Sequence, residues 1–451
     1  MTIFDFTQKE IQTIQDLLRA ETRPVPSMLL EESTPDLGTA DIPCEVFFSR
    51  QYHELEVEKL WKKVWQSTCR EEDIPKVGDY VVYDLADLSV IVVRSAPDKI
   101  RAFHNVCLHR GMQLRVSNGN IPVFRCPFHG WTWNLDGTLA HIPCRWDFEH
   151  VNDKAFRLPE LKVATWQGIV FVNFNPDCEL LESYLENIPE QFNYIPFPPK
   201  DCFTALHIIK VMPANWKVTL EAFMESYHFI ATHPQLLPFV GNTITQYNVY
   251  GRHSRTIVPL GVQSHHLGCQ IDQQALVKHF AAFEGADPAM VTLAEGMTAR
   301  SYAAEVTRQR QSERLGLDCS TLLDTEILDL LSYFIFPNLL VTPSLGSPLQ
   351  NRFWPNGNDP DSCIMEVRIV LPYPSGQRPP VAKIHRLAPD ENWANVPGFE
   401  KIGVIFDQDT SNLRRLQRGL KASAKPGVTL SRYQESTIRH FHQVLERQLL
   451  S

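Results

Sequence analysis

The sequence predicts an α+β protein of two domains, one of which is an all-β insertion. The chain has 451 residues, more than one ordinary hydrophobic core accommodates. Short β-rich runs separated by turn residues follow Gly78, which is typical of an all-β module. After residue 200, strand-like and helical patterns mix, which indicates a second domain built on an antiparallel sheet.

Two helices are expected before the first strands. Residues 7–20 carry apolar side chains at helical spacing, so we expect an amphipathic helix there. A loop rich in Pro, Glu and Ser follows over residues 22–43, and residues 50–64 predict a second helix. The β-rich runs of the all-β module are residues 80–83, 89–93, 100–103 and 166–172.

Four further segments are expected to form the framework of the second domain. Residues 202–212 and 364–372 predict strands, and residues 214–231 and 410–421 predict helices.

The composition excludes several classes of partner. A net charge of −9 argues against nucleic acid as a partner, because the phosphate backbone demands a basic face. The first residues lack the basic and apolar regions of a secretory signal, and no apolar run reaches the length of a membrane span. The 10 cysteines are scattered and do not suggest a disulfide framework. We therefore expect a cytoplasmic protein that binds neither nucleic acid nor membrane.

Two short Cys/His pairs are the most informative motif. Cys107-Leu108-His109 is followed by sixteen residues and then by Cys126-Pro127-Phe128-His129. Two Cys on one iron and two His on the other are the ligands of a Rieske [2Fe–2S] cluster, whose potential lies well above that of all-Cys clusters. A Cys₂His₂ zinc site is the main alternative, but zinc fingers usually pair Cys with Cys and His with His.

The predicted helix over residues 214–231 is apolar nearly all round but carries a polar stripe. Glu221, Glu225 and His228 are spaced i, i+4 and i+7, so they share one helix face. Polar groups on a buried helix cost free energy unless they are paired or bind a metal. Pro234 disfavours helix at His233, so the backbone can bend and bring His233 beside His228.

Two histidines need a carboxylate to complete the facial triad that binds Fe(II) and leaves positions open. Glu225 is close in sequence, whereas Asp409 directly precedes the helix expected over residues 410–421. An Asp in that place most often caps the helix, and spacing alone favours the cap.

Residues 101–137 closely resemble the Rieske segment of ring-hydroxylating oxygenase α subunits, and the resemblance extends over most of the chain. The runs Asn215-Trp216-Lys217 and Glu225-Ser226-Tyr227-His228, together with His233, look like the mononuclear-iron motif of this family. The resemblance implies a Rieske [2Fe–2S] domain inserted in a helix-grip (Bet v1-like) catalytic domain with an antiparallel sheet. It places an N-terminal segment over residues 1–45, the Rieske domain over 46–165 and the catalytic domain over 166–451.

The resemblance also implies ligand roles. The cluster ligands are Cys107, His109, Cys126 and His129. The iron ligands are His228, His233 and an Asp shortly before a helix like Gln417-Arg418-Gly419-Leu420, which matches Asp409, with Asp407 as the reserve candidate.

Glu225 departs from the family, which usually has Asp there. That carboxylate bridges the iron ligand, here His228, to a cluster histidine, here His129, of the neighbouring subunit in a head-to-tail homotrimer. We expect Glu225 to keep this bridging role; the alternative is that it only orients His228. By analogy, the Glu mildly favours monooxygenation or demethylation over dihydroxylation.

The implied function is that of a terminal oxygenase. Electrons from NAD(P)H would arrive through a reductase, with or without a ferredoxin, and O₂ would be used to hydroxylate, dihydroxylate or demethylate an apolar substrate, with an aromatic one favoured. A small β subunit beside the α trimer stays open. The residues near the iron motif that would bound an apolar cavity, or equally form plain core, are Phe223, Phe229, Leu236, Leu237, Phe239 and Val240.

Two other functions remain open. A Rieske electron-transfer protein without oxygenase activity would leave Glu225, His228 and His233 unexplained. A helix-grip module without catalytic iron would bind an apolar ligand and not turn it over.

Overall fold

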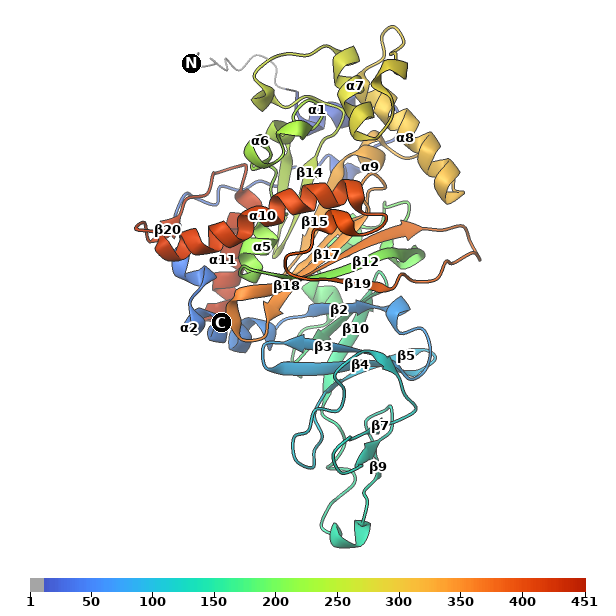
Figure 1. The fold of residues 1–451 in the computed structure, drawn as a ribbon, viewed down its shortest axis with the longest axis vertical. Helices are drawn as coiled ribbons and strands as arrows, with labels where there is room; N and C mark the ends of the chain where they lie inside the picture. The colour runs from blue at the N-terminus through green and yellow to red at the C-terminus, as the bar shows by residue number, and fades with distance from the viewer. Residues whose placement is uncertain (1–11) are drawn as a thin grey trace.

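The computed structural model describes residues 12–451, which form two lobes arranged along the long axis of the molecule (Figure 1). The β-rich lobe occupies the lower part of this view, and the lobe built on the larger sheet lies above it. The first part of the helix expected over residues 7–20 falls outside the described residues, and its remainder contains α1 (Ile14–Arg19).

The lower lobe is the predicted all-β module. The hairpin between β3 (Asp79–Leu85) and β4 (Leu88–Ala96) needs only two turn residues, Ala86 and Asp87, and Ala86 adopts a positive φ of 50° there. In sheet order its strands are β2 (Gln66–Arg70), β11 (Ile169–Asn173), β10 (Glu160–Trp166), β5 (Lys99–His104), β4 (Leu88–Ala96), β3 (Asp79–Leu85) and β6 (Gly119–Asn120). A smaller sheet contains β7 (Phe124–Arg125), β8 (Thr132–Trp133) and β9 (Leu139–His141).

The upper lobe is built on a predominantly antiparallel sheet, as predicted. The strand expected over residues 202–212 is present with those bounds, and it pairs along its length with the strand that contains residues 364–372. In sheet order the strands are β13 (Gln246–Tyr250), β14 (His253–Val258), β15 (Leu330–Ile335), β16 (Leu339–Thr342), β17 (Leu349–Asn356), β18 (Asp359–Pro372), β12 (Cys202–Met212) and β19 (Ile384–Leu387).

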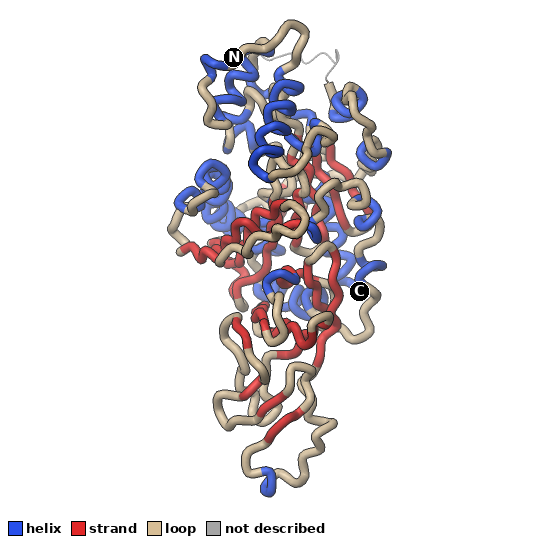
Figure 2. The backbone as a smooth tube through the Cα atoms, turned by 90° about the vertical axis from the view of Figure 1, so that its right-hand side faces the viewer, coloured by secondary structure: helices blue, strands red, loops and turns tan. Residues whose placement is uncertain are grey.

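Helices flank the large sheet, whereas the lower lobe consists mainly of strands and loops (Figure 2). The helices are α2 (Arg50–Glu56), α3 (Leu181–Tyr184), α4 (Ile188–Gln191), α5 (Trp216–Glu221), α6 (Phe229–Thr232), α7 (Gln273–Phe283), α8 (Ala299–Leu315), α9 (Asp324–Leu328), α10 (Glu400–Ala422) and α11 (Ser436–Leu450). A two-residue pairing joins β1 (Ile42–Pro43) to β20 (Gly427–Val428). Within residues 12–451, no helix combines the length and the apolar character that crossing a membrane requires.

Three predicted segments differ in the structure. The single helix expected over residues 214–231 is two short helices, α5 and α6, joined by residues 222–228. The helix expected over residues 410–421 begins ten residues earlier, as α10. The strand expected over residues 166–172 is interrupted by a turn at Gln167 and Gly168, both at positive φ, so it belongs to β10 and β11.

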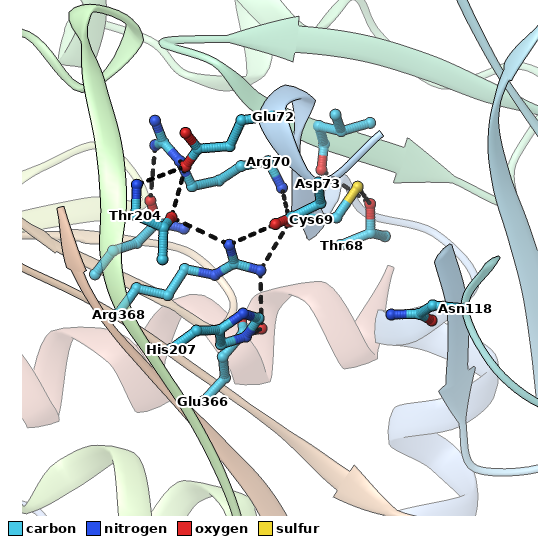
Figure 3. Close-up of polar contacts among 12 residues, drawn as sticks. Thr68, Cys69, Arg70, Glu72, Asp73, Asn118, Thr204, His207, Glu366 and Arg368 are labelled. Atoms are coloured by element: carbon cyan, nitrogen blue, oxygen red, sulfur yellow. Dashed lines mark hydrogen bonds and ion pairs between the residues drawn. The ribbon is translucent and has the colours of Figure 1, made fainter. Parts of the chain in front are cut away.

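A buried network of charges joins the two lobes (Figure 3). Arg368 on β18 donates to Asp73, which follows β2, at 2.8 Å. On the other side, Arg368 contacts Glu366 at 3.2 Å, and Glu366 lies 2.7 Å from His207 on β12. Burial alone would raise the pKa of Glu366, but Arg352 and Arg368 outweigh it and hold the pKa well below its usual range. Paired charges therefore join the β module to strands β12 and β18 of the large sheet.

Candidate metal centres and active-site cavity

The two Cys/His pairs lie on two matching loops of the β module. In one loop, Gly111 N–H donates to Cys107 O at 3.0 Å, and in the other, Gly130 N–H donates to Cys126 O at 3.1 Å. Both glycines have positive φ, 76° and 74°, which explains why glycine follows each pair. The loops therefore bring the four predicted cluster ligands to one end of the β module.

The donor groups on these loops fit a [2Fe–2S] cluster. The imidazole rings of His109 and His129 lie 4.7 Å apart, centre to centre, and Cys107 and Cys126 are buried. Burial raises the pKa of the Cys107 thiol to about 11. A bound iron would offset this effect, because a metal deprotonates a coordinating thiol. His109 Nδ1 is buried without a hydrogen-bond partner, and the ring stacks on Trp131 at 5.0 Å. An unpartnered nitrogen held in a fixed plane is what a metal ligand requires.

The loop between α5 and α6 forms the first half of the second centre. Glu225 accepts hydrogen bonds from the backbone N–H groups of Tyr227 and His228, so its side chain stabilises the turn that precedes α6. Glu225 Oε1 also lies 2.5 Å from His228 Nδ1. This turn interrupts the predicted helix. Glu221, the third member of the predicted polar stripe, instead contacts His442 Nε2 at 2.6 Å.

The second half of this centre comes from the middle of α10. Asp409 Oδ1 lies 2.6 Å from His233 Nε2 and 3.3 Å from His228 Nε2. One donor atom from each of these three residues lies within 4.8 Å of the others. Asp409 is therefore not a helix N-cap, because its helix begins at Glu400. Asp407 points elsewhere and accepts from the backbone N–H groups of Trp393 and Ala394.

Gln408 was not among the predicted site residues, yet it contacts the second centre. Its Oε1 lies 2.8 Å from His233 Nδ1, which leaves His233 Nε2 directed at Asp409. Gln is one of the commonest polar residues on exposed helix faces, so the sequence held no signal for this contact.

The three residues fit a divalent metal. His228 Nε2 is buried without a hydrogen-bond partner. Burial would lower the pKa of His228, but its contacts with Asp409 and Glu225 outweigh burial and raise the pKa to about 10. The site thus favours a positive charge on this ring, and a cation at Nε2 would replace the proton. Two imidazoles and one carboxylate are the ligand set of non-haem Fe(II) sites.

A cavity of about 500 Å³ begins at this centre. Its inner end contains His228, His233 and Asp409, and Glu225 lies beside them. Of the residues predicted to bound a cavity, Leu237 is absent from the lining, although it packs in the same core cluster as Phe229 and Phe239. Those that do line it are Phe223, Phe229, Leu236, Phe239 and Val240. Its size suits a small organic molecule next to the three donor atoms.

Comparison with protein families gives two matches. Residues 64–157 match the Rieske [2Fe–2S] domain, and residues 196–451 match the ring-hydroxylating alpha subunit (catalytic domain). The two matched ranges contain all the predicted cluster and iron ligands.

Curated relatives are oxygenase components. The chain is 30% identical to the carnitine monooxygenase oxygenase subunit of Acinetobacter baumannii over 203 residues, which are 45% of this chain and 54% of that protein. It is also 30% identical to the anthranilate 1,2-dioxygenase large subunit of Acinetobacter baylyi over 207 residues, 44% of each chain. The chain thus spans about half the length of the curated relatives it matches.

Solved structures agree on the fold. The quaternary ammonium Rieske monooxygenase CntA in complex with L-carnitine aligns with a TM-score of 0.64 at 19% identity, covering 93% of this chain and 100% of that one. A naphthalene 1,2-dioxygenase variant bound to phenanthrene aligns with a TM-score of 0.61 at 19% identity, covering 93% of this chain and 94% of that one. A Rieske domain joined to a mixed helix and antiparallel-sheet catalytic domain is common to all of them.

Proposed function

Because this chain belongs to the ring-hydroxylating α-subunit family, whose characteristic cofactors are a Rieske [2Fe–2S] cluster and a mononuclear iron, we propose that it is a terminal oxygenase component. One observation carries the proposal: His228, His233 and Asp409 converge at the inner end of a cavity in a chain that also contains the Cys/His loops. A Rieske electron-transfer protein has no need of the three converging residues, and a ligand-binding module has no need of the loops.

Each donor set has a defined task in this proposal. Cys107, His109, Cys126 and His129 would hold the cluster, and His228, His233 and Asp409 would hold Fe(II). When bound, the cluster supplies electrons one at a time, and the iron supplies O₂ chemistry. Phe223 and Phe229 beside the iron ligands would exclude water from the reacting carbon. NAD(P)H would be used indirectly, through a reductase and with or without a ferredoxin.

Glu225 is the proposed bridge between subunits. Its carboxylate contacts His228 Nδ1 and is itself held by backbone N–H groups, so it can fix the tautomer of the ring. In a homotrimer, the same carboxylate would connect His228 to the His129 of a second copy.

The proposed substrate is a quaternary ammonium compound oxidised at an N-methyl group. The names of several relatives, which are carnitine and glycine betaine monooxygenases, favour a quaternary ammonium compound over the aromatic substrate expected from the sequence. In the cavity, the ring faces of phenylalanines such as Phe223 and Phe229, at the end near the iron ligands, could contact a trimethylammonium group. An aromatic ring is the second candidate, because those rings suit it equally and the chain also resembles anthranilate and chlorobenzene dioxygenases.

The test is oxygen uptake by the purified, iron-loaded protein with a generic reductase and NADH. Five compounds would be compared: L-carnitine, γ-butyrobetaine, glycine betaine, anthranilate and chlorobenzene. We expect substrate-dependent uptake with formaldehyde or hydroxylated product, and three irons per chain. Two irons per chain and no uptake with any compound would favour the electron-transfer function instead.

Glu225→Gln tests the bridge, because it preserves size and removes charge. We expect both iron centres to be retained while turnover falls by about 100-fold, with slow reoxidation of the reduced cluster. Glu221→Gln is the matched control, since Glu221 contacts His442 and not His228. Equal reoxidation rates in the two variants would contradict the bridge.

A further inference from the structure

The opening of the active-site cavity contains charges that the proposed iron chemistry does not use. At this end the lining comes from three helices: the end of α7, the last turns of α8 and the start of α10. The charged residues there are Glu284, Arg310, Arg314, Glu400 and Lys401.

Most of these charges are already paired. Glu284 Oε2 accepts from Arg310 Nη1 at 2.6 Å and from Lys401 Nζ at 3.2 Å, so a single carboxylate holds two cations. Lys401 also lies over the Phe283 ring, 5.4 Å from its centre. Glu400 accepts from the backbone N–H of Gly398 at 3.1 Å. Each charged side chain at the opening therefore has a charged or backbone partner, with one exception.

Arg314 is the exception. In residues 12–451, no carboxylate forms an ion pair with it and no acceptor forms a hydrogen bond with it. Partial burial, followed by the nearby charge of Arg310, lowers the pKa of Arg314. Its place in the last turn of α8 is favourable for any cation because of the helix dipole, but that does not require a position on the cavity wall. Three cations against two carboxylates leave the opening with net positive charge.

We propose that Arg314 binds a carboxylate of the substrate, so that the substrate is an organic acid whose oxidisable carbon extends toward His228, His233 and Asp409. This inference rests on the proposed function for what happens at the inner end of the cavity. A cation without an acidic group would be repelled by the opening, so a quaternary ammonium substrate would have to be zwitterionic. A guanidinium can hold a carboxylate through two parallel hydrogen bonds, which fixes orientation as well as charge.

Two pairs of probes separate the acid from the rest of the molecule. They are γ-butyrobetaine with its methyl ester, and anthranilate with methyl anthranilate. Binding to the iron-loaded protein would be measured by isothermal titration calorimetry, independently of turnover. We expect one acid to bind at least about 10-fold more tightly than its ester, the scale of one charge-assisted contact. Arg314→Gln should abolish this preference, and Arg314→Lys should retain part of it.

Lys278→Gln is the control, because Lys278 is an exposed cation on α7 that does not line the cavity. It should bind both members of each pair as the unsubstituted protein does. Equal affinity for acid and ester, no binding of either acid at millimolar concentration, or an acid preference that survives in Arg314→Gln would overturn the inference. Arg314-dependent binding of an acid without oxygen uptake would instead leave the inference standing and count against the proposed oxygenase function.

Discussion

The two candidate metal centres are assembled in different ways. The candidate cluster ligands lie between residues 107 and 129 on two loops of one small module, each loop closed by its own backbone hydrogen bonds. The candidate iron ligands combine a loop after α5 with Asp409, which is 176 residues from His233 in the sequence. The first centre is therefore local, whereas the second exists only when the large sheet has brought α10 beside α6.

The cluster site should keep its metal when the mononuclear iron site is changed, and the iron site should keep its metal when the cluster site is changed. Asp409→Ala should remove the mononuclear iron and lower activity by on the order of 1,000-fold or more, because loss of even an outer partner of a ligand costs about 10–100-fold. The visible absorption of the cluster should remain. Cys126→Ser should have the opposite effect, with the cluster lost and the iron retained. Iron content and visible spectra of the two variants decide this.

Asp407→Ala is the control for the carboxylate. It removes contacts to the backbone of Trp393 and Ala394, so we expect a loss of about 1 kcal/mol in stability and full iron content. Loss of iron from this variant would contradict the choice of Asp409 over Asp407 as the third ligand. Loss of the cluster from Asp409→Ala would mean that the two centres are not independent.

A smaller effect should follow from changing the group behind His233. Gln408→Leu removes the acceptor at His233 Nδ1, and we expect Fe(II) affinity to fall by about 10–100-fold with the cluster unchanged. Competition with a chelator measures this affinity. Gln235→Leu is the matched comparison, because Gln235 contacts Gln408 and not the histidine. Similar losses in both variants would argue against an orienting role for Gln408.

The large sheet should also differ from the β module in its sensitivity to acid. His253 on β14 is buried in its neutral form, with Nε2 donating to Tyr184 O and Nδ1 accepting from Phe336 N–H. Burial lowers its pKa to about 3. Because the folded pKa lies below the unfolded one, this contribution to stability is complete above pH 6.5 and is lost as the pH falls toward 3.

Between pH 6.5 and 5 the loss from this residue is at most about 2 kcal/mol. We expect His253→Gln to be less stable at pH 8 but to show a shallower decline with acid. Thermal unfolding of the catalytic domain at several pH values measures the slope. An unchanged slope in the variant would show that acid sensitivity arises elsewhere.

The predictability of the two regions follows the same division. The strands of the β module and its two Cys/His loops could be predicted from the sequence because their spacing and turn residues are local; the assignment of the four ligands stays a prediction. The prediction of one helix over residues 214–231 was wrong, because an apolar pattern cannot reveal that the Glu225 side chain accepts from the backbone N–H groups of Tyr227 and His228 and stabilises a turn there. Spacing alone favoured a helix cap for Asp409, because the helix was expected to begin at residue 410 and not at Glu400. The family resemblance was needed to make Asp409 a candidate iron ligand.

The cavity opening lay beyond any local reading of the sequence. Glu284, Arg310 and Lys401 meet there from three helices, so their pairing and the unpaired state of Arg314 depend on the assembled fold. Sequence patterns report which face of an element is apolar, but they carry no record of which distant charges neutralise one another.

The charge network between the lobes bears on attempts to build hybrid enzymes. Glu72 and Asp73 belong to the β module, while their partners Thr204 and Arg368 belong to the large sheet. If the β module came from a related enzyme without an equivalent of Asp73, Arg368 would lose one of its carboxylate partners while staying buried. Burying a charge without its partner costs several kcal/mol. A chimera should therefore take Asp73 and Arg368 from the same parent enzyme, and likewise Glu72 and Thr204.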